Sequence, residues 1–347
     1  LLWHDGCMEL RQYNLRESDM VLFLFKSRLL HICLALVGAT LTASLSARPL
    51  VVGYSDWPGW VAWEVAVEKQ WFAEAGLEVE FEWFDYAASM EAFAAGQLDA
   101  VTMTNGDTLV TGSTGAQAVM ILVGDYSNGN DMVVAAPGIH SVGDLKGKRV
   151  GVEIGFVGHL LLLDALESVG LTESDVELVN IPTNEAPQVL ASGDVDAIVA
   201  WQPNSGQSLS RVPGSTAIYT SGDQPGLIYD VLAVSPTSLN ANREDWGKVV
   251  EVWYRVVDYI LDPATEADAV SIMAARVGLT PDQYAPLLAG TKLLTLEEAK
   301  GYFKQTEGFD SLVGSSRISD EFNRKYDVYR EPQNLDAYID ASLTLGL

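Results

Sequence analysis

The hydrophobic and polar positions along the chain predict two similar α/β units. In the first unit, apolar runs predict strands at 50–54 and 101–104, and period-two alternation predicts a half-exposed strand at 78–83. Helices fit the segments 61–75 and 87–95 between these strands. Strands that alternate with helices in this order must be parallel and joined by crossovers.

The second unit repeats the order of the first. Strands are predicted at 148–153, 176–179 and 197–201, with helices at 159–169 and 185–191. We therefore predict an α/β fold with two lobes, each built on a βαβαβ-type sheet flanked by helices. Two lobes imply a cleft between them.

A short repeat supports this division. Ala94–Val101 (Ala-Ala-Gly-Gln-Leu-Asp-Ala-Val) recurs as Ala191–Ile198 (Ala-Ser-Gly-Asp-Val-Asp-Ala-Ile). Each copy is typical of a helix end, a glycine in the left-handed conformation, and an Asp-Ala entry into a buried strand. The alternative is a chance similarity of two short segments.

The lobes are predicted to be discontinuous in sequence. Lobe one comprises 48–132 and 235–347, and lobe two comprises 133–234. The apolar segments Met132–Ala136 and Val231–Val234 are interpreted as the two hinge crossovers. A helical C-terminal extension is expected to pack on lobe one, with a capped helix start at Thr295. Its predicted helices are 244–261, 266–277, 281–288 and 296–303.

Residues 1–47 are interpreted as a leader, and residues 20–47 as a secretory signal peptide. Lys26 and Arg28 form its positive end, and an apolar stretch of about 13 residues follows, which is short for a membrane span. Cleavage is expected near Ser46 or Ala47, and Met20 is a plausible start. An uncleaved anchor is the alternative.

Charge and cysteine content narrow the function. The formal net charge of −26 argues against a nucleic-acid partner, which demands a basic face. Both cysteines, Cys7 and Cys33, fall in the predicted leader. The mature chain then has no disulfide and no cysteine nucleophile, and we expect a periplasmic location.

Candidate binding residues follow from the rule that ligands of open parallel sheets bind beyond the carboxyl ends of the strands. The turns at these ends carry carboxylates, aromatic rings and amides, and they carry no Lys or Arg. The predicted ligand-binding residues are Asp56, Trp57, Trp60, Asp85, Tyr86, Asn105, Asp107, Glu153, Trp201, Gln202 and Asp230.

This composition suits a small cation, because carboxylates accept paired N–H bonds and aromatic faces attract cations. For each residue the alternative is a structural role as a helix cap, core ring or turn residue. Gly155–Gly158 is predicted to begin a helix whose N-terminus attracts anions. However, it offers no hydroxyl, and Glu153 beside it would repel an anion.

Signatures of catalysis and of cofactors are absent from the sequence. The mature chain has only His140 and His159, without metal spacing, and His159 is expected to pack under a turn. Gly143–Arg149 lacks the spacing of a P-loop, and no dinucleotide-binding glycine motif follows a strand. We expect no catalytic residue, no metal and no cofactor.

Several of these segments resemble the solute-binding proteins of ABC importers of the nitrate, sulfonate and taurine type. The resemblance spans roughly residues 50–345 and rests on both Gly-x-x-Asp-Ala copies and four further segments: Gly53-Tyr54, Trp71–Leu77, Asp144–Lys148 and Trp201-Gln202-Pro203. It implies a type II periplasmic binding protein, monomeric by default, that works with a membrane permease and an ATPase. Two departures weigh against an oxyanion: Trp-Gln-Pro replaces Trp-Glu-Pro, and 155–158 replaces a hydroxyl-bearing turn.

A narrower resemblance concerns the branch whose importers accompany urea-carboxylase-type enzymes. It rests on Ser55–Trp60, Glu82–Tyr86 and Asp125–Asp131. It implies a small nitrogen-rich ligand, with guanidine favoured and urea next. The alternatives are a small oxyanion or sulfonate (taurine, nitrate or bicarbonate), an aminopyrimidine, an enzyme of the pyrimidine-synthesis type, a sensor that signals to a membrane receptor, and the effector domain of a transcription regulator.

Overall fold

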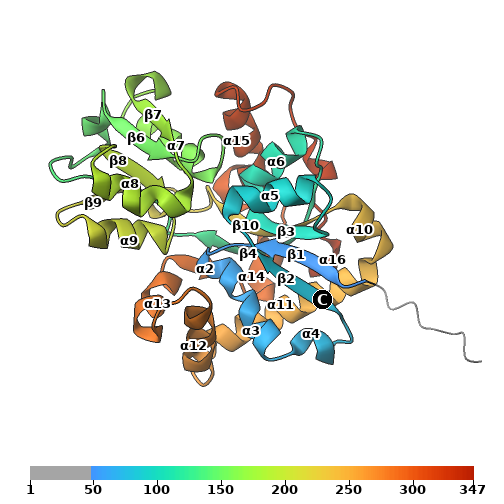
Figure 1. The fold of residues 1–347 in the computed structure, drawn as a ribbon. Coiled ribbons are helices and arrows are strands. Elements are labelled where there is room, and N and C mark those ends of the chain that lie inside the picture. The colour runs from blue at the N-terminus through green and yellow to red at the C-terminus, as the bar shows by residue number, and fades with distance from the viewer. Residues whose placement is uncertain (1–47) are drawn as a thin grey trace, which may run out of the picture. The chain divides into compact units, whose positions relative to one another are not determined.

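Two β-sheets organise the part of the chain that the computed structural model describes, residues 48–347 (Figure 1). The predicted leader and its signal peptide lie outside the described residues. The first sheet has the strand order β11-β4-β10-β3-β1-β2, and the second has β7-β6-β8-β5-β9. The strands of the first sheet are β1 Leu50–Tyr54, β2 Val79–Trp83, β3 Ala100–Thr104, β4 Val119–Ser127, β10 Tyr229–Val234 and β11 Thr291–Leu293. Those of the second are β5 Met132–Ala135, β6 Arg149–Val152, β7 Glu177–Asn180, β8 Ala197–Ala200 and β9 Thr216–Thr220.

The two sheets share one topology over five strands. In the first, β1 pairs in parallel with β2 and β3, and β10 then joins β3 and β4 by antiparallel pairing. In the second, β6 pairs in parallel with β7 and β8, and β5 joins β8 and β9 by antiparallel pairing. The predicted α/β fold with two βαβαβ units is therefore confirmed.

The short repeat has the same geometry in both units. Gly96 and Gly193 both adopt left-handed backbone, with φ of 72° and 78°. The carboxylate of Asp99 accepts the backbone N–H of Val51 at 3.0 Å, and that of Asp196 accepts the backbone N–H of Arg149 at 2.9 Å. Each aspartate thus ties its own strand to the first strand of its unit, so the repeat is structural and lies outside the ligand site.

Helices cover the faces of both sheets. The predicted helix 61–75 is broken into three, because Pro58 begins a helix early and Gln70 adopts φ of 57°. The helices and 3₁₀ turns up to β9 are α2 Pro58–Val61, α3 Trp63–Glu68, α4 Trp71–Glu74, α5 Tyr86–Ala94, α6 Asn105–Ser113, η1 Val142–Leu145, α7 Val157–Ser168, η2 Glu173–Asp175, η3 Thr183–Glu185, α8 Ala186–Ser192 and α9 Asn204–Arg211.

The crossovers between the sheets differ from the prediction. Met132–Ala135 forms β5 inside the second sheet, and Tyr229–Val234 forms β10 inside the first. The chain passes between the sheets at 128–131 and at 221–228 instead. Both apolar segments are strands because each pairs on two sides in its own sheet. The predicted division into lobes at 132/133 and 234/235 stays a prediction.

The C-terminal region is helical and contacts the first sheet, but it also includes three α-helices that the pattern did not predict: α10 Pro236–Ala241, α15 Leu312–Lys325 and α16 Ser342–Leu345. α15 lies beside α6 and reaches α7 (Figure 1). The predicted cap at Thr295 is confirmed, since its hydroxyl accepts the backbone N–H of Glu298. These elements are η4 Ser221–Asp223, α10 Pro236–Ala241, α11 Arg243–Leu261, α12 Glu266–Arg276, α13 Pro281–Leu288, α14 Leu296–Tyr302, η5 Gly308–Asp310, α15 Leu312–Lys325, η6 Leu335–Ala337 and α16 Ser342–Leu345.

The core of the first unit is rich in aromatic rings. Trp63, Trp246 and Trp253 are fully buried, and Trp63 packs on Trp253 with ring centroids 4.5 Å apart. This packing fixes α3 and α11 against the sheet and holds the strand ends that carry the candidate site. No helix between residues 48 and 347 is long and apolar enough to span a lipid bilayer.

Candidate functional site

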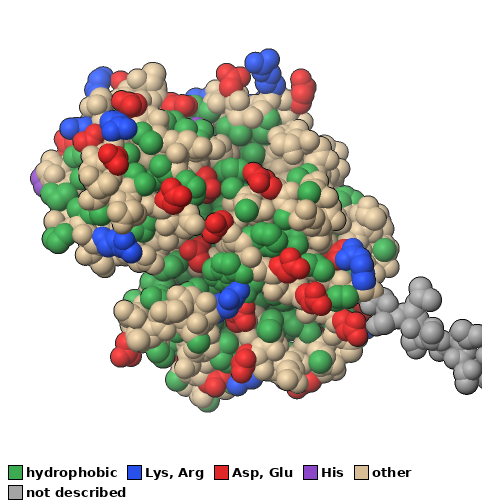
Figure 2. Space-filling view, viewed as in Figure 1, with side chains coloured by type: hydrophobic (Ala, Val, Ile, Leu, Met, Phe, Trp, Pro, Cys, Tyr) green, Lys and Arg blue, Asp and Glu red, His purple; other side chains and the backbone are tan. Residues whose placement is uncertain are grey.

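A small pocket lies where strand ends of the first sheet meet strand ends of the second. Its volume is about 40 Å³, enough for a ligand of only a few heavy atoms. Acidic side chains are visible across this part of the surface in Figure 2. The lining contains three carboxylates and no Lys, Arg or His. The lining residues are Ser55, Asp56, Trp83, Phe84, Asp85, Tyr86, Glu153, Pro182, Thr183, Asn184 and Trp201.

Two of the carboxylates bond across the pocket. Asp56, which follows β1, accepts hydrogen bonds from Trp201 Nε1 at 3.0 Å and from Asn204 Nδ2 at 2.8 Å. Asp85, which follows β2, accepts a hydrogen bond from Asn184 Nδ2 at 3.1 Å. Burial raises the pKa of Asp56, and the charge of Asp85 adds to the shift. These neutral donors connect the two sheets' segments and leave the negative charge uncompensated.

The third carboxylate, Glu153, follows β6 of the second sheet. It is held by the hydroxyl of Thr183, which donates to Oε2 at 3.3 Å. Burial raises the pKa of Glu153 to about 7, with contributions from the charges of Asp107, Asp85 and Asp56. The negative charges of Asp56, Asp85 and Asp107 therefore act on Glu153 from across the pocket.

Asp107 belongs to the first turn of α6, and its side chain reaches the N-terminus of α7. Its carboxylate accepts the hydroxyl of Tyr86 at 2.6 Å and the backbone N–H of Val157 at 3.2 Å. Burial raises its pKa to about 6, whereas these bonds lower it. The predicted anion-attracting helix start is thus present, but a carboxylate of this chain already occupies its first N–H group.

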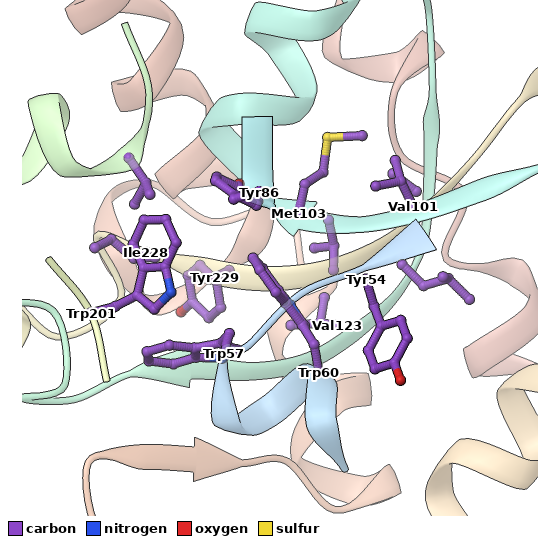
Figure 3. Packing of buried hydrophobic residues seen from close by; sticks show 14 of the residues in the cluster. Tyr54, Trp57, Trp60, Tyr86, Val101, Met103, Val123, Trp201, Ile228 and Tyr229 are labelled. Carbon is purple, nitrogen blue, oxygen red and sulfur yellow. The ribbon is translucent and has the colours of Figure 1, made fainter. Parts of the chain in front are cut away.

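Aromatic rings form the wall behind the pocket. Figure 3 shows Trp57, Trp60, Tyr86 and Trp201 gathered together. Tyr86 stacks on Trp60 with centroids 5.1 Å apart, and Trp201 meets Tyr86 edge-on at 5.1 Å. Trp201 follows β8 of the second sheet, whereas the other three belong to the first unit. The rings therefore join both units.

Behind these rings lies a carboxyl pair, Asp125 on β4 and Asp230 on β10. The two residues stand directly opposite each other in the antiparallel register. Trp57 Nε1 donates to Asp125 Oδ1 at 2.9 Å. Asp125 was not among the predicted site residues, because the strand-end rule concerns parallel strands and β4 is antiparallel. In the sequence, Asp125 stood out only as the first residue of the segment 125–131, which carries part of the narrower family resemblance.

The structure brings nine of the eleven predicted residues into or around this site. Asp56, Asp85, Tyr86, Glu153 and Trp201 line the pocket, and Trp57, Trp60, Asp107 and Asp230 lie behind it. Gln202, next to Trp201, has a buried Oε1 without a hydrogen-bond partner and faces Gly206 of α9.

Asn105 has a structural role. Its amide Nδ2 donates to the hydroxyls of Ser315 and Ser316 on α15, and its Oδ1 accepts the backbone N–H of Tyr229. His159, as expected, packs under the turn before α7, where Nδ1 accepts the N–H of Gly155.

We expect Gly59→Ala to destabilise the protein by about 1–3 kcal/mol, because the new methyl group overpacks the site. A Cβ there would overlap Asp125 Oδ2 and lie 2.8 Å from Trp57 Nε1. Thermal denaturation measures the effect. The matched control is Gly301→Ala in α14, where no atom lies within 4 Å and a gain of up to about 1 kcal/mol is expected. Equal melting temperatures for Gly59→Ala and the wild type would contradict this packing.

Comparison with known proteins places the chain in a family. Residues 44–274 match the NMT1-like family. The chain belongs to this family. A protein of Brucella abortus whose name describes it as a binding protein is 31% identical over 177 residues, which is 50% of this chain and 54% of the relative. The taurine-binding periplasmic protein of Escherichia coli is 26% identical over 194 residues, 55% of each chain. The chain spans about half the length of the curated relatives it matches.

Solved structures of several other proteins share the fold. The periplasmic aliphatic sulphonate binding protein of E. coli superposes with a TM-score of 0.69 at 19% identity, covering 86% of this chain and 100% of the other. A desulfurization enzyme superposes with a TM-score of 0.61 at 17% identity, covering 86% and 98%. The fold thus serves binding proteins and an enzyme alike, and the site has to decide the function.

Proposed function

We propose that this NMT1-like protein is the periplasmic solute-binding component of an ABC importer. Two of its relatives are named as binding proteins, one of them periplasmic, and its fold is that of a periplasmic binding protein. The pocket lies between two units with the same topology, a geometry suited to closure around a solute by a hinge. In this proposal residues 20–47 direct export, and a permease and an ATPase in the inner membrane receive the solute from a monomeric protein.

The ligand we propose is a small, nitrogen-rich solute, with the guanidinium cation favoured and neutral urea next. The observation that carries this choice is the lining of the pocket: Asp56, Asp85 and Glu153 with no basic side chain. Buried carboxylates without a cationic partner are costly unless a proton or a ligand compensates them. A guanidinium ion supplies both the charge and several N–H donors.

Size and shape support the same ligand class. The pocket of about 40 Å³ suits a planar ion of a few heavy atoms. Tyr86 and Trp201 lie beside the carboxylates, and an aromatic face attracts a cation by about 0.5–2 kcal/mol. An aminopyrimidine is larger and would need the pocket to widen.

The second candidate is a small oxyanion or sulfonate, which the names of the relatives favour. The sulphonate and taurine binders of E. coli are similar to this chain in fold and sequence respectively. The geometry opposes this candidate, since the first N–H of α7 is taken by Asp107 and Glu153 lies nearby. An added anion would meet at least two carboxylates at that point.

A direct binding test separates the candidates. Thermal unfolding of the protein from about Arg48 is measured with guanidinium below its denaturing range, urea, taurine, nitrate or bicarbonate. A ligand at 100 times its dissociation constant adds about 2.7 kcal/mol to the stability. A shift with guanidinium alone is the expected result. A shift with taurine or nitrate alone overturns the cation proposal and leaves the importer proposal intact. Turnover of a bound compound would indicate an enzyme instead.

The pocket carboxylates give a sharper test by substitution. Asp85→Asn and Glu153→Gln are each expected to weaken guanidinium binding at least about tenfold, because a bond to a charged group contributes about 1.5–3 kcal/mol. Calorimetric titration measures the change. The control is Asp164→Asn, a carboxylate of α7 that bonds Tyr219 outside the pocket. Wild-type affinity in both pocket variants would show that the ligand binds elsewhere.

A further inference from the structure

The pair Asp125–Asp230 is buried without a compensating cation. The two residues are 1% and 3% exposed, and the Oδ2 atoms of both have no hydrogen-bond partner among the described residues outside the pair itself. Residues directly opposite in an antiparallel sheet have Cβ atoms only about 4.5–5.5 Å apart. Two ionised carboxylates at that separation in a dry interior repel each other strongly, so the pair holds a proton between them.

The groups that face the pair increase this demand for positive charge. Two further carboxylates raise the pKa of Asp230 by their negative charge: Asp131, in the crossover 128–131, and Asp107, on α6. The remaining titratable neighbours are the neutral phenols of Tyr86 on α5 and Tyr284 on α13. No Lys, Arg or His in residues 48–347 forms an ion pair or hydrogen bond with either member of the pair. Burial accordingly raises the pKa of both members.

The pair is continuous with the pocket through the aromatic wall. Trp57, which holds Asp125, packs against Trp60, which in turn stacks on Tyr86 of the pocket lining. Trp60 Nε1 is also buried without a partner. Trp201 completes this wall from the second sheet, where its ring meets Tyr86 edge-on (Figure 3).

We propose that Asp125 and Asp230 form an inner cation site, and that a small organic cation binds there in exchange for the proton that the pair shares. The proposal rests on the proposed function and adds an inner position, behind the aromatic wall, for the same class of ligand. In the exchange, the O–H bond of the protonated carboxyl breaks and its proton passes to solvent. N–H groups of the cation then donate to the freed oxygens, so one positive charge replaces another. In residues 48–347 no three His, Cys, Asp or Glu side chains are arranged to hold a metal ion.

Proton release on binding tests this exchange. Guanidinium is titrated calorimetrically near pH 7 in two buffers with different ionisation enthalpies, and the difference in heat counts the protons released. We expect about one proton to be released per ion bound. Because protons compete with the cation, the affinity should fall about tenfold for each unit by which the pH is lowered below 7. Asp230→Asn should lose both the release and the pH slope, and Asp125→Asn should behave alike. The matched control Asp164→Asn should behave as wild type.

The outcomes separate this inference from the proposed function. If guanidinium binds without proton release, or if Asp230→Asn releases as many protons as wild type, the exchange is wrong and the cation importer stands. If Glu153→Gln abolishes the release and Asp230→Asn does not, the proton belongs to Glu153 and the inner site is wrong. If guanidinium does not bind at all, both the exchange and the choice of a cation as ligand are wrong, whereas the importer proposal stands or falls with the other members of the panel. Infrared absorption of a protonated carboxyl, lost in Asp230→Asn and on adding guanidinium, gives an independent readout of the pair.

Discussion

The ligand-free protein is expected to become more stable as the pH falls from about 8 to about 5, by an amount on the order of 3 kcal/mol. Burial raises the pKa of Asp107 to about 6, and that of Asp131 and Glu153 to about 7. In the unfolded chain these groups titrate near pH 4. Between the two sets of values the folded state binds more protons, and its stability falls as the pH rises.

One buried group opposes this trend. Burial lowers the pKa of His159 to about 4, so below about pH 6.5 the unfolded state gains a proton there that the folded state lacks. Because three carboxyl groups bind additional protons in the folded state and only one imidazole loses one, the folded state still binds more protons than the unfolded state between pH 5 and 8. Exposed carboxylates with lowered pKa values, such as Asp144, lose their contribution only below about pH 4, so the maximum is expected near pH 5.

Differential scanning calorimetry at a series of pH values measures this effect. Heat is the right denaturant, because urea and guanidinium are both candidate ligands. Asp131→Asn should flatten the pH dependence by about one proton, and the surface variant Asp144→Asn should leave it unchanged between pH 5 and 8. A stability that is constant or rises from pH 5 to pH 8 would show that these carboxyls are ionised at ordinary pKa values in the folded protein.

Local chemistry explains which parts of the fold could be predicted from the sequence. Gly96 and Gly193 end helices at left-handed positions, and Asp99 and Asp196 then bond to a neighbouring strand in the same way. Such signals are short-range, and they identified both parallel units. The break at Gln70 carried no Gly or Pro signal, and the segment 61–75 was therefore predicted as one helix.

The site depended more on contacts that are distant in sequence. The strand-end rule found Asp56, Asp85 and Glu153, because the ends of parallel strands meet wherever the sheets face each other. It assigned Asn105 to the ligand as well, but the serines of α15, 210 residues away, bond its amide. No local pattern predicts such a partner. Asp125 was missed for the related reason that its partner Asp230 arrives by antiparallel pairing.

Removing the carboxylate of Asp107 is expected to reverse the ligand preference. Asp107→Ala frees the backbone N–H of Val157 and the hydroxyl of Tyr86, both of which now donate to that carboxylate. α7 is 12 residues long, and its N-terminus carries roughly half a positive charge. An oxyanion can then place one oxygen where the carboxylate was. We expect guanidinium affinity to fall at least about tenfold and binding of taurine or nitrate to become measurable.

Asp107→Asn serves as the matched variant that isolates charge from occupancy. Its amide oxygen still accepts the N–H of Val157, so the helix start stays occupied although the negative charge is gone. Guanidinium affinity should fall in both variants, whereas taurine or nitrate should bind only to Asp107→Ala. Titration calorimetry near pH 8, where Asp107 of the wild type is ionised, measures both affinities. If both variants keep wild-type affinity for guanidinium and neither binds an oxyanion, Asp107 is a packing residue and the electrostatic argument against an anionic ligand fails with it.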